Sequence, residues 1–434
     1  MKINRFLPFL TVICIFFCAL MPIPVLAEEE NPFGLPEFPE ISSNYVVLMD
    51  ADSKEVLYSK NPDSKCYPAS TTKLLTALIT LENRALSDTI TFSQAAVNSI
   101  EYGDANASVS AGETLTIEQA LYCLLLRSAN EVAYGLAEDI AGNVSSFAAM
   151  MNFKAEQLGA DNTHFTNASG LTDQFHYTTP YDMALIATEC FNSKELMNIA
   201  GYSGLYVIPP TNKSSFTRYY KHRYEMLKGG TYEYKYACGG KTGYTDAAGN
   251  CLVSFARKDD LRLVCVIFNS GDAERYTDTA ALFDYYLENY RKIYIDEFDD
   301  CISNDSTNLL SLISALNPSS SSIGFEEGAY LLVPSSVEKD KLTTIVTYGD
   351  SAAYVGSNGG FACISFFYGS NNVGNATVYL HSGNNNSITE ENYFFINIWY
   401  IIAGAAIAVA ITITVIVIKK RNRRPTRGSH KLRF

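Results

Sequence analysis

The feature that most constrains the fold is a pair of strand-like hairpins at the two ends of a long helical stretch. Apolar runs at 45–50 and 56–60 flank a turn-prone segment, and a second pair of runs at 251–257 and 261–269 flanks Lys258-Asp259-Asp260. Strands so far apart share one sheet when the segment between them packs against it. The sequence therefore predicts an α+β fold built on an antiparallel sheet.

Helical periodicity dominates the segment between the hairpins. We expect helices over 70–81, 116–126, 130–141 and 145–158. Gly159 follows the last of these, at the position where glycine favours a left-handed helix end. These helices are expected to flank the antiparallel sheet.

The composition changes near residue 297, where Asn, Ser and Gly become frequent. A Ser-rich segment at 317–322 precedes runs that predict short strands at 329–333, 343–348, 362–367 and 376–381. We therefore expect one domain over 40–296 and a small all-β domain over 297–390.

The two ends of the chain predict export and anchoring. Lys2 and Arg5 precede an apolar stretch, and small residues up to Ala27 resemble a signal-peptidase site, so residues 1–27 are expected to be a signal peptide. Residues 398–418 form a run of 21 residues without a charge, about 31 Å of helix, enough to span a bilayer. The basic tail at 419–434 then indicates a cytoplasmic end.

The charge balance argues against nucleic acid as a partner. The chain has 33 lysines and arginines against 46 acidic residues, and without the ten cations at its two ends 23 remain against the same 46. A segment this acidic repels phosphate backbones.

A candidate nucleophile stands at the first predicted helix, where Ser70 is followed three residues later by Lys73. Residues at this spacing lie on one helical face, so the amine is near enough to take the hydroxyl proton. Ser336 and Lys339 repeat the Ser-x-x-Lys pattern, but in a polar segment of the β-rich part. Only the Ser70 copy opens an apolar helix directly after a hairpin.

Two further motifs follow in order. Ser128-Ala129-Asn130 lies at the bend between two predicted helices, where a hydroxyl can relay a proton and an amide can hold a carbonyl group. Lys241-Thr242-Gly243 precedes the second hairpin, as expected for an edge strand that binds an anionic peptide end. Either motif alone is weak, because turns and solvated lysines explain such fragments.

The sequence gives little support for a serine-protease triad or a zinc site. The histidines do not accompany a Gly-x-Ser-x-Gly elbow, and no His-Glu-x-x-His segment is present. We therefore expect neither a Ser-His-Asp triad nor a metal or other cofactor. His176 and Asp182 are expected to order a loop.

The three motifs, 58 and then 113 residues apart, resemble the signature set of penicillin-binding proteins and serine β-lactamases. Over about 40–296 the chain is most similar to the serine D-Ala-D-Ala carboxypeptidases, and the β-rich part and anchor resemble that family's stalk. Segments that carry the resemblance are 68–73, 128–131, 151–152, 158–159, 163–165, Asn167, 170–171 and 241–246.

The resemblance implies a transpeptidase-like fold and an acyl-enzyme mechanism. Ser70 would be the nucleophile, Lys73 its general base and Ser128 the proton shuttle. The backbone N–H groups of Ser70 and Tyr244 would form the oxyanion hole. Asn130 would hold the peptide carbonyl.

Substrate binding is implied at the third motif and at Arg275. Lys241, Thr242, Gly243 and Tyr244 would line the substrate strand, and Thr242 with Arg275 would hold the terminal carboxylate. Tyr244 stands where some relatives carry histidine, and His222 where they often carry asparagine, which leaves local substrate contacts open.

The implied substrates are peptidoglycan stem peptides that end in D-Ala-D-Ala, and β-lactam antibiotics would be inhibitors. The enzyme would be a single-pass protein of the bacterial cell membrane, with its catalytic domain outside the cell. A class A β-lactamase is the nearest alternative, but 161–171 lacks the Glu-x-x-Leu-Asn pattern of the deacylating glutamate. A non-catalytic protein that binds β-lactams or cell wall is the other alternative.

Overall fold

The computed structural model describes residues 31–295, 321–325, 328–348 and 360–382 of the chain. The predicted signal peptide and the predicted membrane helix lie outside these residues. In the part that is described, no helix has the length and apolar character needed to cross a membrane.

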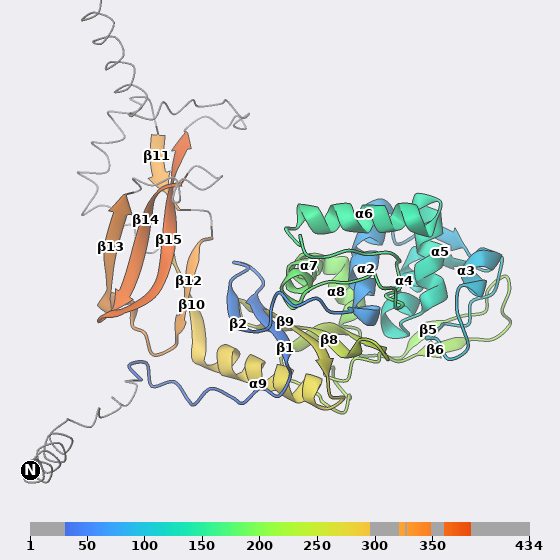
Figure 1. Cartoon of the computed structure of the whole chain (residues 1–434), viewed down its shortest axis with the longest axis horizontal. Helices are drawn as coiled ribbons and strands as arrows, with labels where there is room; N and C mark the ends of the chain where they lie inside the picture. Colours follow the sequence, from blue (N-terminus) through green and yellow to red (C-terminus); the bar gives the residue numbers. More distant parts are fainter. Residues whose placement is uncertain (1–30, 296–320, 326–327, 349–359, 383–434) are drawn as a thin grey trace, which may run out of the picture. The chain divides into compact units, whose positions relative to one another are not determined.

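A five-stranded antiparallel sheet with the order β2-β1-β9-β8-β7 joins the two predicted hairpins (Figure 1). β1 pairs with β9 along its whole length, with Tyr45 opposite Phe268. This sheet confirms the predicted α+β class. Its strands are β1 (Tyr45–Asp50), β2 (Val56–Lys60), β7 (Ala237–Thr245), β8 (Gly249–Lys258) and β9 (Leu261–Ser270).

Alternate residues of the sheet enter two apolar cores, one on each face. Val47 and Met49 of β1 join the core that contains α2, α4, α5 and α7, whereas Val46 and Leu48 join the core that contains α9. All four side chains are completely buried. In Figure 1 the larger group of helices accordingly covers one face of the sheet, and α9 covers the other.

Three of the predicted helices match α4, α5 and α6 to within one residue at each end. The first predicted helix is corrected: α2 begins at Lys73, and a 3-10 turn, η1 (Ala69–Thr72), contains Ser70. The turn is tight because the Thr71 N–H bonds the Pro68 carbonyl. The helices are α2 (Lys73–Asn83), α3 (Gln94–Asn98), α4 (Ile117–Leu126), α5 (Asn130–Ala141), α6 (Val144–Gln157), α7 (Pro180–Asn192), α8 (Lys194–Ala200) and α9 (Glu274–Asn289).

Shorter strands account for the rest. β3 (Thr89–Thr91) pairs with β4 (Thr114–Thr116), β5 (Tyr206–Ile208) with β6 (Arg218–Tyr220), and β10 (Tyr290–Tyr294) with β12 (Tyr330–Pro334). The four strands predicted after residue 297 are confirmed as β12, β13 (Leu342–Tyr348), β14 (Gly360–Tyr368) and β15 (Asn371–Ser382). A short strand, β11 (Ser321–Gly324), and a 3-10 turn, η3 (Lys339–Lys341), complete the described elements.

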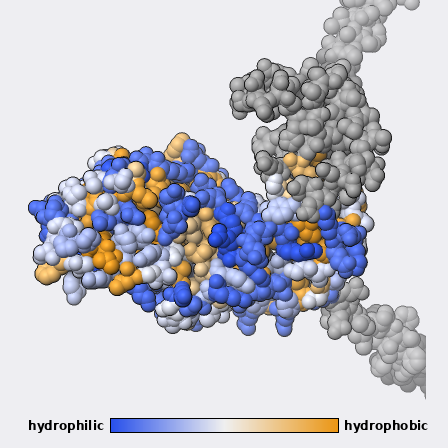
Figure 2. Space-filling view, turned by 180° about the vertical axis from the view of Figure 1, so that it is seen from behind, coloured by the Kyte–Doolittle hydropathy of each residue, from blue (hydrophilic) through white to orange (hydrophobic). Residues whose placement is uncertain are grey.

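The surface is predominantly hydrophilic on the face that Figure 2 shows, with hydrophobic residues in separate patches. Many of the large apolar side chains are buried in the two cores, whereas others such as Tyr102, Phe153 and Phe216 are exposed. The polar residues of the three motifs lie at the junctions between the sheet and the helices, which therefore position them.

Candidate active site

Ser70 is positioned by close contact between three backbone segments. Ala69 takes a left-handed φ of 47°. Gly170 packs against it so closely that a Cβ there would lie 1.8 Å from the Ala69 carbonyl oxygen. A Cβ at Gly243 of β7 would lie 3.0 Å from the Ser70 nitrogen. Glycine is needed at 170, and at 243 a larger residue would push its neighbours apart. The contacts bring the first and third motifs together.

Lys73 lies beneath Ser70 and is completely buried. Its Nζ donates hydrogen bonds to Ser70 Oγ at 3.1 Å, Asn130 Oδ1 at 2.7 Å and the Ser169 carbonyl at 2.5 Å. Burial lowers the pKa of Lys73 to about 7, although the carboxylates of Glu131 and Asp104 oppose this shift. A substantial fraction of Lys73 is therefore neutral near pH 7.

The second motif lies where α4 ends and α5 begins. Ser128 takes a left-handed φ of 62° and is nearly buried. Asn130 starts α5, and its N–H bonds the Ala105 carbonyl at 2.9 Å. Glu131 accepts the N–H of Ala107 at 2.7 Å, so the loop opposite this motif is tied to α5. The side chain of Asn130 is thereby fixed beside Lys73.

Lys241 connects the second and third motifs. Its Nζ donates to Ser128 Oγ at 3.0 Å and to the Thr242 carbonyl at 2.7 Å. Burial is the largest cause that lowers the pKa of Lys241, followed by the nearby charges of Lys73, Arg223 and Arg275. Ser128 is thus hydrogen-bonded to an amine of reduced basicity.

The third motif lies on an edge strand, as predicted. β7 is the last strand of the sheet and pairs with β8 alone, with Lys241 opposite Val253. An edge strand can bind an extended peptide through its free backbone groups. Tyr244 is 60% exposed, and its hydroxyl donates to Asp246 Oδ1 at 3.1 Å.

Arg275 lies in the first turn of α9 and is mostly buried. Its Nη2 forms an ion pair with Asp272 Oδ1 at 2.5 Å, and its Nε donates to the Asp272 carbonyl at 3.2 Å. The guanidinium also lies 4.8 Å from the centre of the Tyr276 ring. The side chain is therefore held in place before any ligand arrives.

A cavity of about 640 Å³ joins these groups. Its lining includes most of the predicted site residues: Ser70, Ser128, Asn130, Thr242, Gly243, Tyr244 and Arg275. Lys73 and Lys241 are hydrogen-bonded to its two serines. Every predicted site residue is thus at or directly behind one cavity.

Sequence reasoning missed several residues that also line the cavity. They are Tyr102, Gly103, Asp104, Ala105 and Arg223. The cavity is also lined by Gly170, Leu171, Thr245 and Asp246, which were noted only as part of the resemblance. Tyr102 to Ala105 and Arg223 come from connecting segments without a recognisable motif. The only available signal for Arg223 was its position beside His222, which is buried and does not line the cavity.

His176 contacts Thr72, which is close to Ser70 in the chain, rather than the nucleophile itself. Its Nε2 lies 3.0 Å from Thr72 Oγ1, and its Nδ1 accepts the Thr166 N–H at 3.1 Å. Burial lowers the pKa of His176 to about 4, so the ring is neutral near pH 7. Asp182 accepts the Asn162 N–H at 2.7 Å. These contacts agree with the expected role in ordering the loop.

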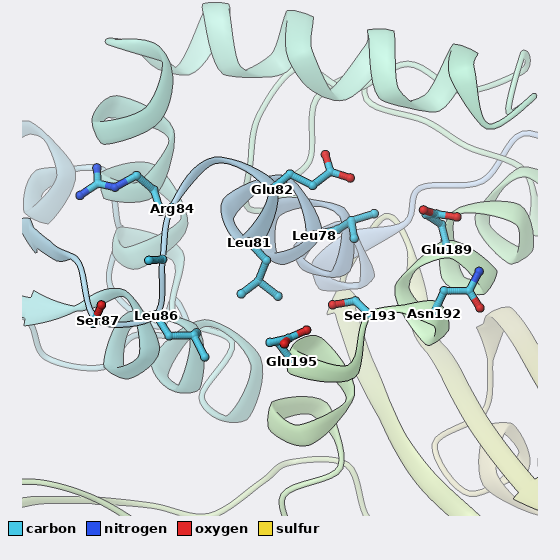
Figure 3. A pocket seen from close by; sticks show the side chains of 11 residues that line it. Leu78, Leu81, Glu82, Arg84, Leu86, Ser87, Glu189, Asn192, Ser193 and Glu195 are labelled. Carbon is cyan, nitrogen blue, oxygen red and sulfur yellow. The ribbon is translucent and has the colours of Figure 1, made fainter. Parts of the chain in front are cut away.

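A separate hollow of about 660 Å³ lies at the ends of α2 and α7 and the start of α8 (Figure 3). Ser87 and Ser193 provide its hydroxyl groups, but neither lysine nor histidine occurs among its lining residues. It therefore lacks the paired nucleophile and base of the Ser70 cavity. Its other labelled residues are Leu78, Leu81, Glu82, Arg84, Leu86, Glu189, Asn192 and Glu195.

Comparison with known proteins decides the family. The family model described as D-alanyl-D-alanine carboxypeptidase, peptidase family S11, matches residues 33–272. The chain belongs to this family. The match covers all three motifs but not the strands after residue 297.

Relatives in this family carry more than one kind of name. The D-alanyl-D-alanine carboxypeptidase DacF of Bacillus subtilis is 31% identical over 250 residues, which are 56% of this chain and 62% of the relative. A D-alanyl-D-alanine endopeptidase of Pseudomonas aeruginosa is 26% identical over 246 residues, 56% of this chain and 76% of that protein. The match to DacF thus spans less than two thirds of its length.

Solved structures of the family share the fold. The D-alanyl-D-alanine carboxypeptidase of Mycobacterium tuberculosis has a TM-score of 0.53 at 29% identity and covers 59% of this chain and 94% of its own. DacD of Francisella tularensis has a TM-score of 0.61 at 22% identity and covers 80% of this chain and 94% of its own, which supports the fold alone.

Proposed function

We propose that this family member is a serine D-Ala-D-Ala carboxypeptidase that removes the terminal D-alanine from peptidoglycan stem peptides. The observation that carries the proposal is the buried Lys73, with a pKa of about 7, hydrogen-bonded to Ser70 Oγ. An amine that is partly neutral at physiological pH can act as general base for a hydroxyl nucleophile.

Acylation starts when neutral Lys73 accepts the proton of Ser70. The hydroxyl oxygen attacks the carbonyl carbon of the penultimate D-alanine, and the backbone N–H groups of Ser70 and Tyr244 stabilise the oxyanion by about 3 kcal/mol per donor. Asn130 orients the peptide carbonyl. Collapse of the tetrahedral intermediate breaks the peptide bond and leaves an ester on Ser70.

The leaving D-alanine needs a proton on its amine. Ser128 donates its hydroxyl proton and regains one from Lys73, so the proton that Lys73 took from Ser70 reaches the leaving amine and Lys73 is neutral again. Lys241 Nζ donates a hydrogen bond to Ser128 Oγ at 3.0 Å, and Lys73 Nζ donates one to Asn130 Oδ1 of the same motif. A water molecule then attacks the ester, Lys73 accepts one of its protons, and Ser70 recovers its hydroxyl. The two half-reactions together hydrolyse one peptide bond.

Recognition of the free C-terminus is assigned to Thr242 and Arg275, with Gly243 and Tyr244 of β7 alongside the peptide. A carboxylate gains charge-assisted hydrogen bonds there that an internal peptide bond cannot make. The need for a free C-terminal carboxylate distinguishes a carboxypeptidase from an endopeptidase. One relative is named an endopeptidase.

A β-lactam contains a strained amide and a carboxylate that imitate the substrate, so the same serine is expected to be acylated. Residues 161–171 contain no glutamate to activate a deacylating water. We therefore favour a stable acyl-enzyme over the class A β-lactamase alternative. The paired amines and serines favour catalysis over the non-catalytic binding alternative.

The proposed setting is the outer face of a bacterial cell membrane. The predicted signal peptide, membrane helix and basic tail support export with one C-terminal anchor. Under this proposal 40–296 is the catalytic domain and 297–390 a β-rich stalk. No metal or other cofactor takes part in the proposed reaction.

Release of D-alanine tests the proposal directly. The full-length chain in detergent should liberate one D-alanine per molecule of diacetyl-Lys-D-Ala-D-Ala, and Ser70→Ala should liberate none above background. Ser336→Ala serves as the matched control and should keep the parent rate. A parent protein that binds penicillin covalently but releases no D-alanine would contradict the carboxypeptidase proposal.

A further inference from the structure

The basic residues at the cavity differ in how much positive charge each can present to a ligand. Lys73 has a pKa of about 7, and burial also lowers the pKa of Lys241. Near neutral pH a fraction of Lys73 is therefore uncharged. Two arginines, Arg223 and Arg275, line the same cavity and keep their charge in proteins.

The charge of Arg275 is already engaged. Asp272 pairs with its Nη2 at 2.5 Å and accepts from its Nε through the backbone carbonyl at 3.2 Å. A substrate carboxylate at Arg275 must share the guanidinium with Asp272. Arg275 can thus orient a substrate carboxylate, but Asp272 already compensates part of its positive charge.

Arg223 is in a different situation. It lies between His222 and Tyr224, which are both buried, and the Tyr224 N–H bonds His222 Nδ1 at 3.0 Å. This fixes the backbone while the Arg223 side chain is exposed at the cavity. Within the described residues, the Arg223 guanidinium has neither an ion pair nor a hydrogen bond.

Arg223 is also electrostatically close to the catalytic lysines. Its charge lowers the pKa of Lys241 more than the charge of Arg275 does, and it also lowers the pKa of Lys73. Partial burial, followed by the charge of Arg127, lowers the pKa of Arg223 itself. The positive potential near Lys241 therefore comes more from Arg223 than from Arg275.

We propose that Arg223 is a substrate-binding residue that supplies the uncompensated positive charge for the terminal carboxylate of the peptide. Arg275, held by Asp272, orients that carboxylate. The inference rests on the proposed carboxypeptidase function and deepens it. It predicts that selectivity for a free C-terminus depends on two arginines from distant parts of the chain.

The test compares one peptide as its acid and as its amide. Full-length parent, Arg223→Gln and Arg223→Lys are assayed in detergent with diacetyl-Lys-D-Ala-D-Ala and with its C-terminal amide. Arg257→Gln is the matched control, because Arg257 is an exposed arginine outside the cavity lining. The ratio of kcat/KM for acid to kcat/KM for amide is independent of the fraction of protein that is folded.

Arg223→Gln should lower this ratio by about tenfold to 150-fold, mainly through a higher KM for the acid, because a charge-assisted contact is lost. Arg223→Lys should recover part of the ratio, and Arg257→Gln should leave it unchanged. An unchanged ratio in Arg223→Gln would overturn the inference, whether both rates are retained or both fall equally. A parent that cleaves neither peptide would overturn the proposed function and this inference with it.

Discussion

Lys73 Nζ lies 3.1 Å from Ser70 Oγ at the junction of η1 and α2, and the lysine is completely buried. The contact arises because a 3-10 turn followed by a helix places residues three apart on one side. Burial then changes an ordinary cation into an amine that loses its proton near pH 7.

The first prediction concerns the pH dependence of acylation. Neutral Lys73 is the active form, so the rate of reaction with penicillin should rise as the pH increases through about 7. The charge of Glu131 raises the pKa of Lys73, so Glu131→Gln should move this rise to lower pH. The Gln oxygen can still accept the Ala107 N–H. The measurement is the acylation rate constant across the pH range.

Glu118→Gln is the control for that experiment, since Glu118 is an exposed acid in the first turn of α4. It should leave the pH profile in place. A profile that moves to higher pH in Glu131→Gln, or does not move, would contradict the role given to Lys73.

The second prediction concerns acid stability. The folded pKa of His176 is about 4 against an ordinary 6.5, so between these values the unfolded chain binds more protons than the folded one. The free energy of unfolding should therefore fall as the pH drops from 6.5 towards 4, by up to about 1.4 kcal/mol per pH unit from this group. His176→Asn removes the titration, so its urea unfolding should depend less on pH.

The matched variant His164→Asn changes a histidine that is exposed to solvent. Its urea unfolding should keep the parent's dependence on pH. Equal dependence in the parent and in His176→Asn would show that burial of His176 contributes nothing to acid sensitivity.

The third prediction concerns Arg275. Arg275→Ala should lower kcat/KM for the free-acid peptide by about tenfold to 150-fold and slow acylation by penicillin, since both ligands carry a carboxylate. Asp272→Asn should not lower either rate, because it removes the competitor for the guanidinium. If Arg275→Ala cleaves the peptide at the parent rate, Arg275 does not bind the carboxylate and is only a cation at the start of α9.

The fourth prediction concerns anchoring. A chain ended before Tyr393 lacks the charge-free run at 398–418 and should remain in the soluble fraction with its penicillin-binding activity. The full chain should sediment with membranes. Recovery of the shortened chain in the membrane fraction would point to another membrane-binding surface.

Much of the fold followed from local patterns in the sequence. The 130–141 helix was predictable from its helical periodicity, and α5 indeed spans Asn130–Ala141. The β1 and β9 pairing followed from two apolar hairpins that need a common core. The start of α2 was not predictable, since the left-handed Ala69 is set by contact with Gly170.

The site was predictable where chemistry comes in motifs and unpredictable where it comes from connecting segments. Lys73 and Lys241 stand in recognisable spacings, whereas Asp104 and Arg223 reach the cavity only through tertiary packing. The pairing of Asp272 with Arg275 was likewise not predictable, because Asp272 is an exposed acid that precedes α9 and belongs to no motif. Short strands such as β5 and β6 give too few residues for a periodic signal.

The most direct test of the account is to locate the acyl group. The full-length chain is incubated with benzylpenicillin, digested and analysed by mass spectrometry, with Ser70→Ala and Ser336→Ala in parallel. We expect one penicilloyl adduct on the peptide that contains Ser70, stable for many minutes, present in Ser336→Ala and lost in Ser70→Ala. An adduct on the peptide that contains Ser336, or rapid turnover of the drug without an adduct, would contradict the account.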